Sequence, residues 1–331
     1  MPKNRRLAAL PVLGLSLIIS MFGLAIPVVR GAAPGLHFSP DALKSRVSSM
    51  VGERYRTTSA NRLKKTRKTI QTVFKEAGWE VEVRPFSIAG VDGTNIVARR
   101  LGRANPERTW IMGAHYDTAR GTPGADDNAS GIAGILEAAR LLSRHSFRDT
   151  VELVAWDLEE SLHGGSEHMA GAARRAGTKI QCAVSLEMIG FRRIEPGSQR
   201  FPDRLLELFP DIARWSSVRQ HRGDFIAAIG DPGARGVLSA IDAAGKRSGL
   251  PVVTIEATGR AQEVRHLLRS DHASFWAEGY PGVMITDTAN FRNPNYHKAS
   301  DTIETLDFEF AAAVMNAVTE VLLQQAGGGS E

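Results

Sequence analysis

Short apolar segments recur along this chain, and most are separated by stretches with the spacing of a helix. The apolar segments are TNIVARRLG, TWIMGAHYD, TVELVAWDLEE, CAVSLEMIG, DFIAAIGD, VVTIEAT and PGVMITDT. Between the second and the third lies SGIAGILEAARLLSR, whose apolar residues fall on one helical face. Strands that alternate with helices form a mostly parallel sheet that helices cover on both faces. We therefore expect an α/β fold: a single three-layer α/β/α domain with a mostly parallel, mixed central sheet.

The two ends of the chain differ in composition from this domain. MPKNRR is followed by a run without charged residues from Leu7 to Val29, and then by the small residues Gly31-Ala32-Ala33. This order is typical of an export signal, and the run is also long enough to be kept as a membrane anchor. We expect a signal peptide or N-terminal membrane anchor over 1–33, the domain over 34–326 and a disordered tail over 327–331. The domain would then lie outside the cytoplasm, periplasmic, secreted or anchored to the membrane.

Charge and cysteine content exclude several classes of protein. The net charge is +5, from 41 basic and 36 acidic residues, and the densest basic run, RLKKTRK, is typical of a solvated helix face. Because no aromatic residues are interleaved with basic ones, we expect no nucleic-acid partner. The chain has one cysteine, Cys182, so an intramolecular disulfide and a cysteine-rich zinc site are both excluded. The apolar neighbours of Cys182 indicate a small core residue.

Polar side chains stand where the expected strands end. His115 and Asp117 end one strand, Glu159 and Glu160 follow the next, and Glu187 ends another. Ligands bind at the carboxyl ends of parallel strands, so these groups would converge if their strands are neighbours. Imidazole and carboxylate donors without thiolate suit zinc or a harder ion such as manganese. Taken singly, however, the same residues also suit a hydrogen-bonded strand end, a solvated helix start and a polar turn, so the spacing leaves both interpretations open.

Six blocks of sequence resemble those of a known family. In chain order they are HYD, GADDNASG, DLEESLHGGSEH, SLEMIG, SDHASFWAEGYPGVMITDT and NPNYHKASDT, and the likeness runs from about residue 90 to about 310. Together they resemble the zinc-dependent aminopeptidases, co-catalytic dinuclear zinc exopeptidases related to glutamate carboxypeptidase, the transferrin-receptor ectodomain and glutaminyl cyclase. The resemblance implies the zinc exopeptidase (phosphorylase/hydrolase-like) fold, two zinc ions per chain and a peptide substrate.

The resemblance also implies a metal ligand at five positions. His115 and Glu187 would bind one ion, Glu160 and His297 the other, and Asp126 would bridge the two. Asp127 would follow Asp126 through the cis peptide bond known in the family. Glu187 departs from the family pattern, since many members have Asp there, but its longer side chain still reaches an ion.

Three further residues would act in catalysis. The resemblance makes Glu159 the general base and acid, and makes Asp117 the carboxylate that orients a ligating imidazole. The hydroxyl of Tyr296 could hydrogen-bond the oxyanion of the tetrahedral intermediate, although a packing role suits it equally. Five other histidines have no motif around them and are interpreted as surface or structural residues: His145, His163, His168, His221 and His266. A substrate carboxylate could bind to one of five arginines, namely Arg192, Arg193, Arg260, Arg265 and Arg292.

The expected function is that of an exported metallopeptidase, most simply an aminopeptidase. Peptide hydrolysis would use a dinuclear zinc-activated water with Glu159 as base and acid. Three alternatives remain: a glutaminyl-peptide cyclotransferase with one zinc, an amidohydrolase acting on non-peptide substrates, and a non-catalytic partner-binding ectodomain. The last is disfavoured because every ligand position carries a competent side chain. The sequence indicates no oligomeric state, and a membrane contact only through residues 1–33.

Overall fold

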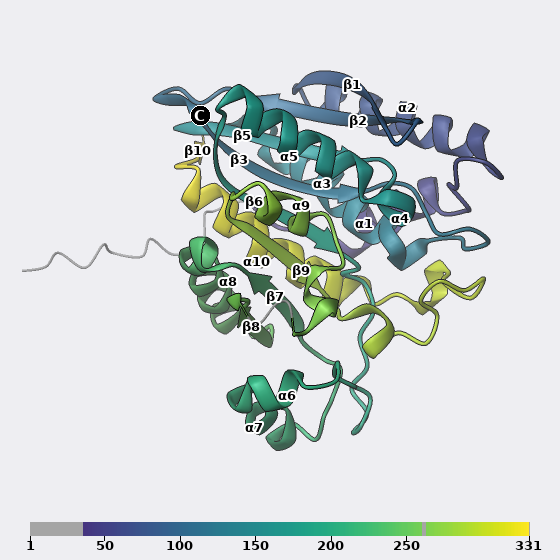
Figure 1. Ribbon diagram of the computed structural model, residues 1–331, viewed down its shortest axis with the longest axis vertical. Coiled ribbons are helices and arrows are strands. Elements are labelled where there is room, and N and C mark those ends of the chain that lie inside the picture. The colour runs from purple at the N-terminus through teal and green to yellow at the C-terminus, as the bar shows by residue number, and fades with distance from the viewer. Residues whose placement is uncertain (1–35, 260–262, 331) are drawn as a thin grey trace, which may run out of the picture. The chain divides into compact units, whose positions relative to one another are not determined.

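The computed structural model describes residues 36–259 and 263–330, which all lie in one unit that begins at Pro34 (Figure 1). The expected signal or anchor over 1–33 and the candidate Arg260 lie outside the described residues. Among the helices that are described, none has the length and apolar character needed to cross a bilayer.

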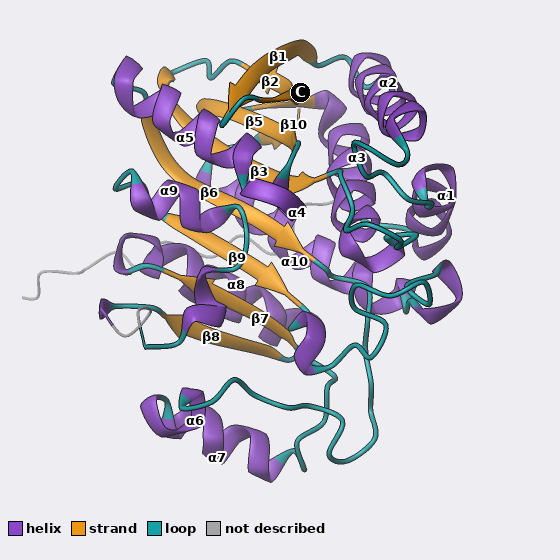
Figure 2. Cartoon of the chain, turned by 45° about the vertical axis from the view of Figure 1, so that its right-hand side comes forward, coloured by secondary structure: helices purple, strands orange, loops and turns teal. Residues whose placement is uncertain are grey.

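A single eight-stranded sheet organises the domain. Its strands are β1 (Glu80–Ile88), β2 (Val91–Arg100), β3 (Asn105–His115), β5 (Asp149–Trp156), β6 (Lys179–Glu187), β7 (Ile226–Gly230), β8 (Val252–Glu256) and β9 (Gly282–Thr286). They lie in the order β1-β2-β5-β3-β6-β9-β7-β8 (Figure 2). Neighbours are parallel from β5 through β3 and β6 to β9, whereas β2 and β7 run antiparallel to β5 and β9. The expected mostly parallel, mixed sheet is confirmed.

Helices cover both faces of this sheet. One face carries α1 (Pro40–Met50), α2 (Ala60–Glu76), α3 (Gly131–Leu141), α8 (Arg235–Ser248) and α10 (Phe308–Gln325). The other face carries α5 (Gly164–Ala176) and α9 (His272–Ala277), in front of the sheet in Figure 1. All residues of β5 are buried, as a parallel strand between two helical layers must be. Cys182 is buried in β6, as expected of a small core residue.

The segment between β6 and β7 leaves the sheet and returns to it. It contains α6 (Leu205–Leu208) and α7 (Pro210–Val218), which lie below β8 in Figure 1. Leu205 and Ile212 from these helices pack with Phe225, Ile229 and Ile255 at the β7–β8 end of the sheet. The excursion therefore forms an apolar wall beside the last strands.

Residues 327–330 do not match the disordered tail expected over 327–331; residue 331 lies outside the described residues. Strand β10 (Gly329–Ser330) pairs antiparallel with β4 (His145–Ser146), and the Gly328 N–H donates to the Leu323 carbonyl at the end of α10. The short β4 segment before β5 offers backbone groups to which the tail can bond, and composition alone gave no sign of this partner.

Candidate metal centre

The parallel strands bring distant parts of the chain to one edge of the sheet. His115 ends β3 and Glu187 ends β6. Glu159 and Glu160 open the short helix α4 (Glu159–Leu162) just after β5, and His297 lies in the loop region after β9. Because β5, β3, β6 and β9 are consecutive parallel neighbours, their carboxyl ends meet at this edge.

Two groups of possible metal ligands share one aspartate, Asp127. His115, Asp127 and Glu187 form the first group, and Asp127, Glu160 and His297 form the second; within each, the ligand atoms lie within 4.8 Å of one another. His115 Nε2 is 3.3 Å from Asp127 Oδ1 and 3.5 Å from Glu187 Oε2. His297 Nε2 is 3.1 Å from both Asp127 Oδ2 and Glu160 Oε2. Asp127 thus turns one oxygen to each group.

These donors fit a metal ion. His115 Nε2 and Asp127 Oδ1 are buried and have no hydrogen-bond partner. An unpaired buried polar group costs roughly 1–3 kcal/mol, and a cation between the two atoms would remove that cost. Imidazole nitrogen and carboxylate oxygen without thiolate are donors that zinc accepts.

Asp126 belongs to neither group, so its expected bridging role is wrong. Its Oδ1 accepts a hydrogen bond from the Gly190 N–H (3.0 Å), and its Oδ2 accepts one from Asn293 Nδ2 (2.8 Å). The backbone at Asp127 is not helical (φ −101°, ψ 90°), and the two neighbouring carboxylates face different partners. The cis peptide bond likewise lies one residue later than expected, between Asp127 and Asn128.

Asp301 holds the turn that carries both aspartates, Ala125–Ser130. Its two carboxylate oxygens accept hydrogen bonds from the backbone N–H groups of Asp126 (2.9 Å) and Asp127 (3.1 Å). Burial raises the pKa of Asp301 to about 7. Nothing in its local sequence distinguishes Asp301, although it stands in the block NPNYHKASDT.

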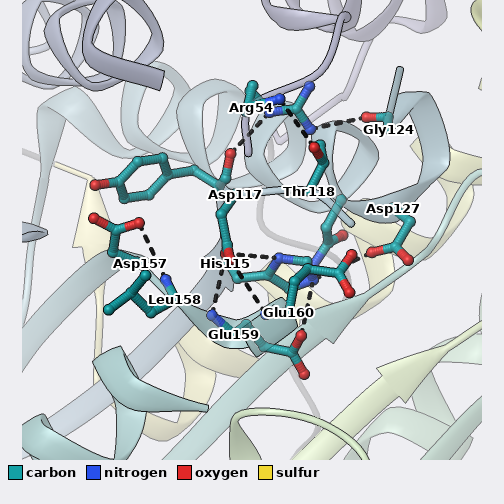
Figure 3. A network of polar contacts seen from close by, with 12 residues as sticks. Arg54, His115, Asp117, Thr118, Gly124, Asp127, Asp157, Leu158, Glu159 and Glu160 are labelled. Atoms are coloured by element: carbon teal, nitrogen blue, oxygen red, sulfur yellow. Dashed lines mark hydrogen bonds and ion pairs between the residues drawn. The ribbon is translucent and has the colours of Figure 1, made fainter. Parts of the chain in front are cut away.

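Asp117 lies between His115 and the two glutamates. Its Oδ1 is 3.4 Å from His115 Nδ1, and its carboxylate accepts hydrogen bonds from the backbone N–H groups of Glu159 and Glu160, each at 3.2 Å (Figure 3). One carboxylate therefore faces the imidazole and also fixes the start of α4. This is the position that an orienting carboxylate needs.

A buried arginine underlies the acidic cluster. The Arg54 guanidinium donates to the carbonyls of Tyr116 and Gly124, among others, and is almost fully buried (Figure 3). Burial lowers the pKa of Arg54 to about 10, although the charges of Asp117 and Asp127 act in the opposite direction. Nothing in the sequence around Arg54 indicated this role.

Glu159 faces the same cleft but is not in either ligand group. Its Oε1 is 3.1 Å from His163 Nδ1, and its Oε2 is 4.0 Å from His115 Nε2. Burial acts to raise the pKa of Glu159, but the two histidines outweigh it and hold that pKa below the usual value. Hydrogen bonding to Glu159 raises the pKa of His163 to about 9. His163 is exposed, as expected of a surface residue, but it also lines the cleft and contacts Glu159, a role that was not expected. Its spacing of four residues from Glu159 at a helix start was the available signal.

Ser270 and Tyr296 contact the ligand groups from the β9 side. Ser270 Oγ donates to Glu187 Oε2 at 2.8 Å. The Tyr296 ring stacks on the His297 imidazole, with centroids 3.8 Å apart, and its hydroxyl accepts a hydrogen bond from Arg269 Nη2 at 2.8 Å.

Arg269 was not among the arginines selected from the sequence. Of those selected, Arg192 pairs with Asp307 and Arg193 with Glu195. Arg292 is buried, with its Nε on Gln199.

An apolar cavity adjoins the metal-ligand cleft. The cleft is lined by Asp127, Glu159, Glu160, His163, Glu187, Arg269, Tyr296 and His297. The cavity has a volume of about 80 Å³ and shares Glu187, Arg269 and Tyr296 with the cleft. Its walls include Phe201, Leu205, Phe225, Ile229, Ile255 and Met284. An apolar group can therefore lie against apolar walls beside the ligand groups.

Comparison with known proteins places this chain in a family. The family model described as Peptidase family M28 matches residues 95–322. The uncharacterized protein YfbL of Escherichia coli (strain K12) is 34% identical over 86% of this chain and 88% of its own length. A probable zinc metalloprotease of Pyrenophora teres f. teres (strain 0-1) is 30% identical over 70% of this chain, which spans only 52% of that relative.

A solved structure shares the fold. The Legionella pneumophila LapA aminopeptidase superposes with a TM-score of 0.67 at 18% identity, covering 88% of this chain and 72% of LapA. At that identity the likeness concerns the fold, whereas the family match spans most of the domain that carries the ligand groups. The chain therefore belongs to peptidase family M28 and is a hydrolase.

Proposed function

We propose that the protein is an exported zinc-dependent aminopeptidase. The observation that carries the proposal is the pair of ligand groups that share Asp127 beside an apolar cavity. The family match, the aminopeptidase fold of LapA and the relative described as a probable zinc metalloprotease support it.

Two zinc ions would occupy the two groups. His115, Asp127 and Glu187 would hold one, and Asp127, Glu160 and His297 the other. When bound, the ions supply positive charge that polarises the scissile carbonyl and lowers the pKa of a water molecule. Asp127 would be the ligand that the two groups share.

Glu159 would move the proton. Its carboxylate lies in the cleft outside both ligand groups, so it is free to take a proton from the attacking water and return it to the leaving amine. Asp117 would hold Glu159 and Glu160 in place through their backbone N–H groups. Tyr296 would donate its hydroxyl hydrogen to the oxyanion of the tetrahedral intermediate.

The cavity would select the substrate side chain. It shares Glu187 and Tyr296 with the cleft, so the residue whose carbonyl reacts can place its side chain there. The apolar walls favour a bulky apolar N-terminal residue, and the carboxylates of the cleft would attract its protonated amine.

A Glu159→Gln variant tests the base assignment. It removes the proton acceptor but keeps shape and one hydrogen-bonding oxygen, so turnover on leucine p-nitroanilide should fall about 10³-fold or more. Zinc content, measured by elemental analysis, should stay at two ions per chain. The exposed Glu167→Gln on α5 is the matched control and should keep normal turnover. Near-normal turnover of Glu159→Gln would remove Glu159 from the mechanism.

A glutaminyl-peptide cyclotransferase is the competing activity inside the same fold. It would need one zinc, whereas two ligand groups are present here. A panel of aminoacyl nitroanilides, dipeptides and peptides with N-terminal Gln, each with and without chelator, separates the two. Cyclisation of N-terminal Gln with one zinc per chain and no hydrolysis would replace the aminopeptidase proposal.

Export rests on residues 1–33 alone. Expression of the full chain in a bacterium, followed by N-terminal sequencing of the protein from the envelope fraction, tests it. A mature N-terminus near Ala33 indicates cleavage of a signal, and an intact N-terminus in the membrane fraction indicates an anchor. Full-length protein confined to the cytoplasm would contradict export.

A further inference from the structure

Arg269 borders both the metal-ligand cleft and the apolar cavity, and no role was expected for it. We propose that Arg269 is a positioning residue that fixes the Tyr296 hydroxyl as a hydrogen-bond donor to the oxyanion. The inference rests on the proposed peptidase function and deepens it.

Neutral groups hold the guanidinium of Arg269 in place. Nη2 donates to Tyr296 Oη (2.8 Å) and Nη1 to Asn290 Oδ1 (3.1 Å), while His266 Nδ1 lies 3.2 Å from Nη1. Burial, and after it the charge of Arg269, lowers the pKa of His266, which favours the neutral ring that can accept this bond. Across the described ranges, 36–259 and 263–330, no carboxylate forms an ion pair with Arg269. These contacts therefore fix the orientation of the Arg269 guanidinium, and no ion pair offsets its positive charge.

The contact with Arg269 decides what the Tyr296 hydroxyl can do. A phenol has one hydrogen to donate, and its oxygen can also accept. Arg269 has no acceptor, so it takes the accepting side of the oxygen and leaves the hydrogen for another partner. Stacking on His297 fixes the ring, and Tyr296 lines the cleft together with Glu159 and Glu187. The Tyr296 hydroxyl forms its strongest hydrogen bond with an oxyanion in this cleft, because the nearby positive charge of Arg269 strengthens a hydrogen bond to a negatively charged acceptor.

Direct binding of a substrate carboxylate by Arg269 is the competing role. A carboxylate is bound best by two parallel N–H groups. In Arg269 both Nη1 and Nη2 already have partners, and only Nε has none among the described residues. The contacts therefore favour the role that acts through Tyr296.

A double-mutant cycle tests the inference, with Arg269→Met, Tyr296→Phe and the double variant. Hydrolysis is measured on leucine p-nitroanilide, Leu-Leu and Leu-Leu-amide. If Arg269 acts through Tyr296, Arg269→Met lowers kcat about 10–100-fold, leaves KM within about twofold and affects the three substrates equally. The double variant then resembles Tyr296→Phe alone, and Arg269→Lys recovers part of the loss because an ammonium can still donate to the phenol. Arg174→Met, at an exposed position on α5, is the control.

Two results would overturn the inference and leave the proposed function standing. One is a loss from Arg269→Met that persists in full in the Tyr296→Phe background. The other is a rise in KM confined to Leu-Leu, whose free carboxylate the amide and the anilide lack. Zinc content and thermal unfolding of each variant show whether a loss of kcat reflects a damaged fold. If the wild-type protein hydrolyses none of the three substrates, the proposed function fails and the inference fails with it.

Discussion

Asp126 and Asp127 carry the same side chain at adjacent positions, yet their surroundings give them different tasks. Asp127 faces two imidazoles, whereas Asp126 accepts hydrogen bonds from Gly190 and Asn293. Burial raises the pKa of Asp126 well above its usual value, helped by the charge of Asp287. His115 and His297 outweigh burial at Asp127 and lower its pKa. A buried carboxylate that holds a loop can be neutral, but one that binds metal must be charged.

Asparagine at the two positions separates these tasks. Asp127→Asn should lose at least one zinc ion per chain and most of the activity, because an amide gives only one weak oxygen ligand. Asp126→Asn should keep both ions and lose roughly 1–3 kcal/mol of stability, because its amide nitrogen cannot accept from Asn293. Elemental analysis measures the zinc content of each variant, and thermal unfolding measures its stability. Normal zinc content in Asp127→Asn would refute the assignment of the shared ligand.

His163 gives the metal-free protein a pH-dependent part of its stability. Its pKa is raised in the folded protein to about 9, against about 6.5 when unfolded. A raised pKa means that the contribution is complete below about pH 6.5 and is lost as the pH rises through about 9. The melting temperature of chelated wild-type protein should exceed that of His163→Gln most at pH 6, and the difference should vanish by about pH 10. In His168, burial lowers the pKa, so His168→Gln should show no such loss; a difference for His163→Gln that is constant from pH 6 to 10 would contradict the linkage.

The sequence predicts the site residues that lie at strand ends. It does not predict the residues that reach the site only through tertiary contacts. His115, Glu159, Glu160 and Glu187 follow from where the strands stop, and His297 came from the resemblance alone. The structure adds residues that contact the site from elsewhere: Arg54, Asp301, Ser270, His163 and Arg269. Apart from the spacing of His163 from Glu159, their local sequence shows no pattern that indicates a role. Each of the others has its role because of a residue that is distant in the sequence, and the periodicity of the sequence does not identify that partner.

At the scale of elements, the start of α3 lies directly against the end of β6. A Cβ added to Gly131, the first residue of α3, would come within 2.9 Å of the Leu186 carbonyl oxygen and 2.7 Å of Asn128 Oδ1. Asn128 in turn bonds to both sides of Glu187, donating to the Leu186 carbonyl and accepting from the Met188 N–H. The glycine thus allows the helix, the turn with Asp127 and the strand with Glu187 to meet.

Gly131→Ala should disturb this junction. Overpacking against backbone costs about 1–3 kcal/mol, and displacement of the β6 end should also weaken zinc binding. Gly236→Ala in α8 is the control, because an added Cβ there meets nothing within 4 Å and should be neutral or stabilising by about 0.4–1 kcal/mol. Denaturant unfolding measures both variants. Equal stability of the two would show that the α3–β6 junction has room to adjust.

The elements differ in how far sequence could predict them. Apolar runs were enough for seven of the eight strands of the main sheet, all except β1, since a buried strand has few alternatives. The pairing of β10 with β4 was missed because two-residue strands have no periodicity. The path of α6 and α7 beside β8 was also not predictable, since long-range apolar packing decides where such an excursion returns.

For the whole molecule, the candidate metal centre joins segments that span most of the domain. The two ligand groups draw on residues from His115 to His297, supplied by the ends of β3, β5 and β6 and by the loop region after β9. Unfolding would separate all of these ligands, so metal that binds only the folded chain must stabilise it as a whole. Zinc should therefore raise the melting temperature of the entire domain in one transition.

This stabilisation should grow with pH because the metal-free ligands hold protons. Burial raises the pKa of Glu160 to about 8. Burial acts to lower the pKa of His297, but hydrogen bonds to Asp127 and Glu160 outweigh it and raise that pKa to about 10. Near pH 7 this hydrogen-bonded pair therefore holds a proton in the metal-free protein, and the pair must lose it to bind metal.

Titration calorimetry with zinc, in two buffers of different ionisation enthalpy, measures the protons released. At pH 7 we expect a net release, an affinity that rises from pH 6 to pH 8, and a zinc-induced increase in melting temperature that is larger at pH 8. Asp126→Asn should behave like the wild type, since Asp126 lies outside both ligand groups. Heats independent of the buffer, with an affinity that does not change with pH, would show that the ligands are already deprotonated. In that case burial and hydrogen bonding do not raise the pKa values of Glu160 and His297 enough to keep a proton on the pair at pH 7.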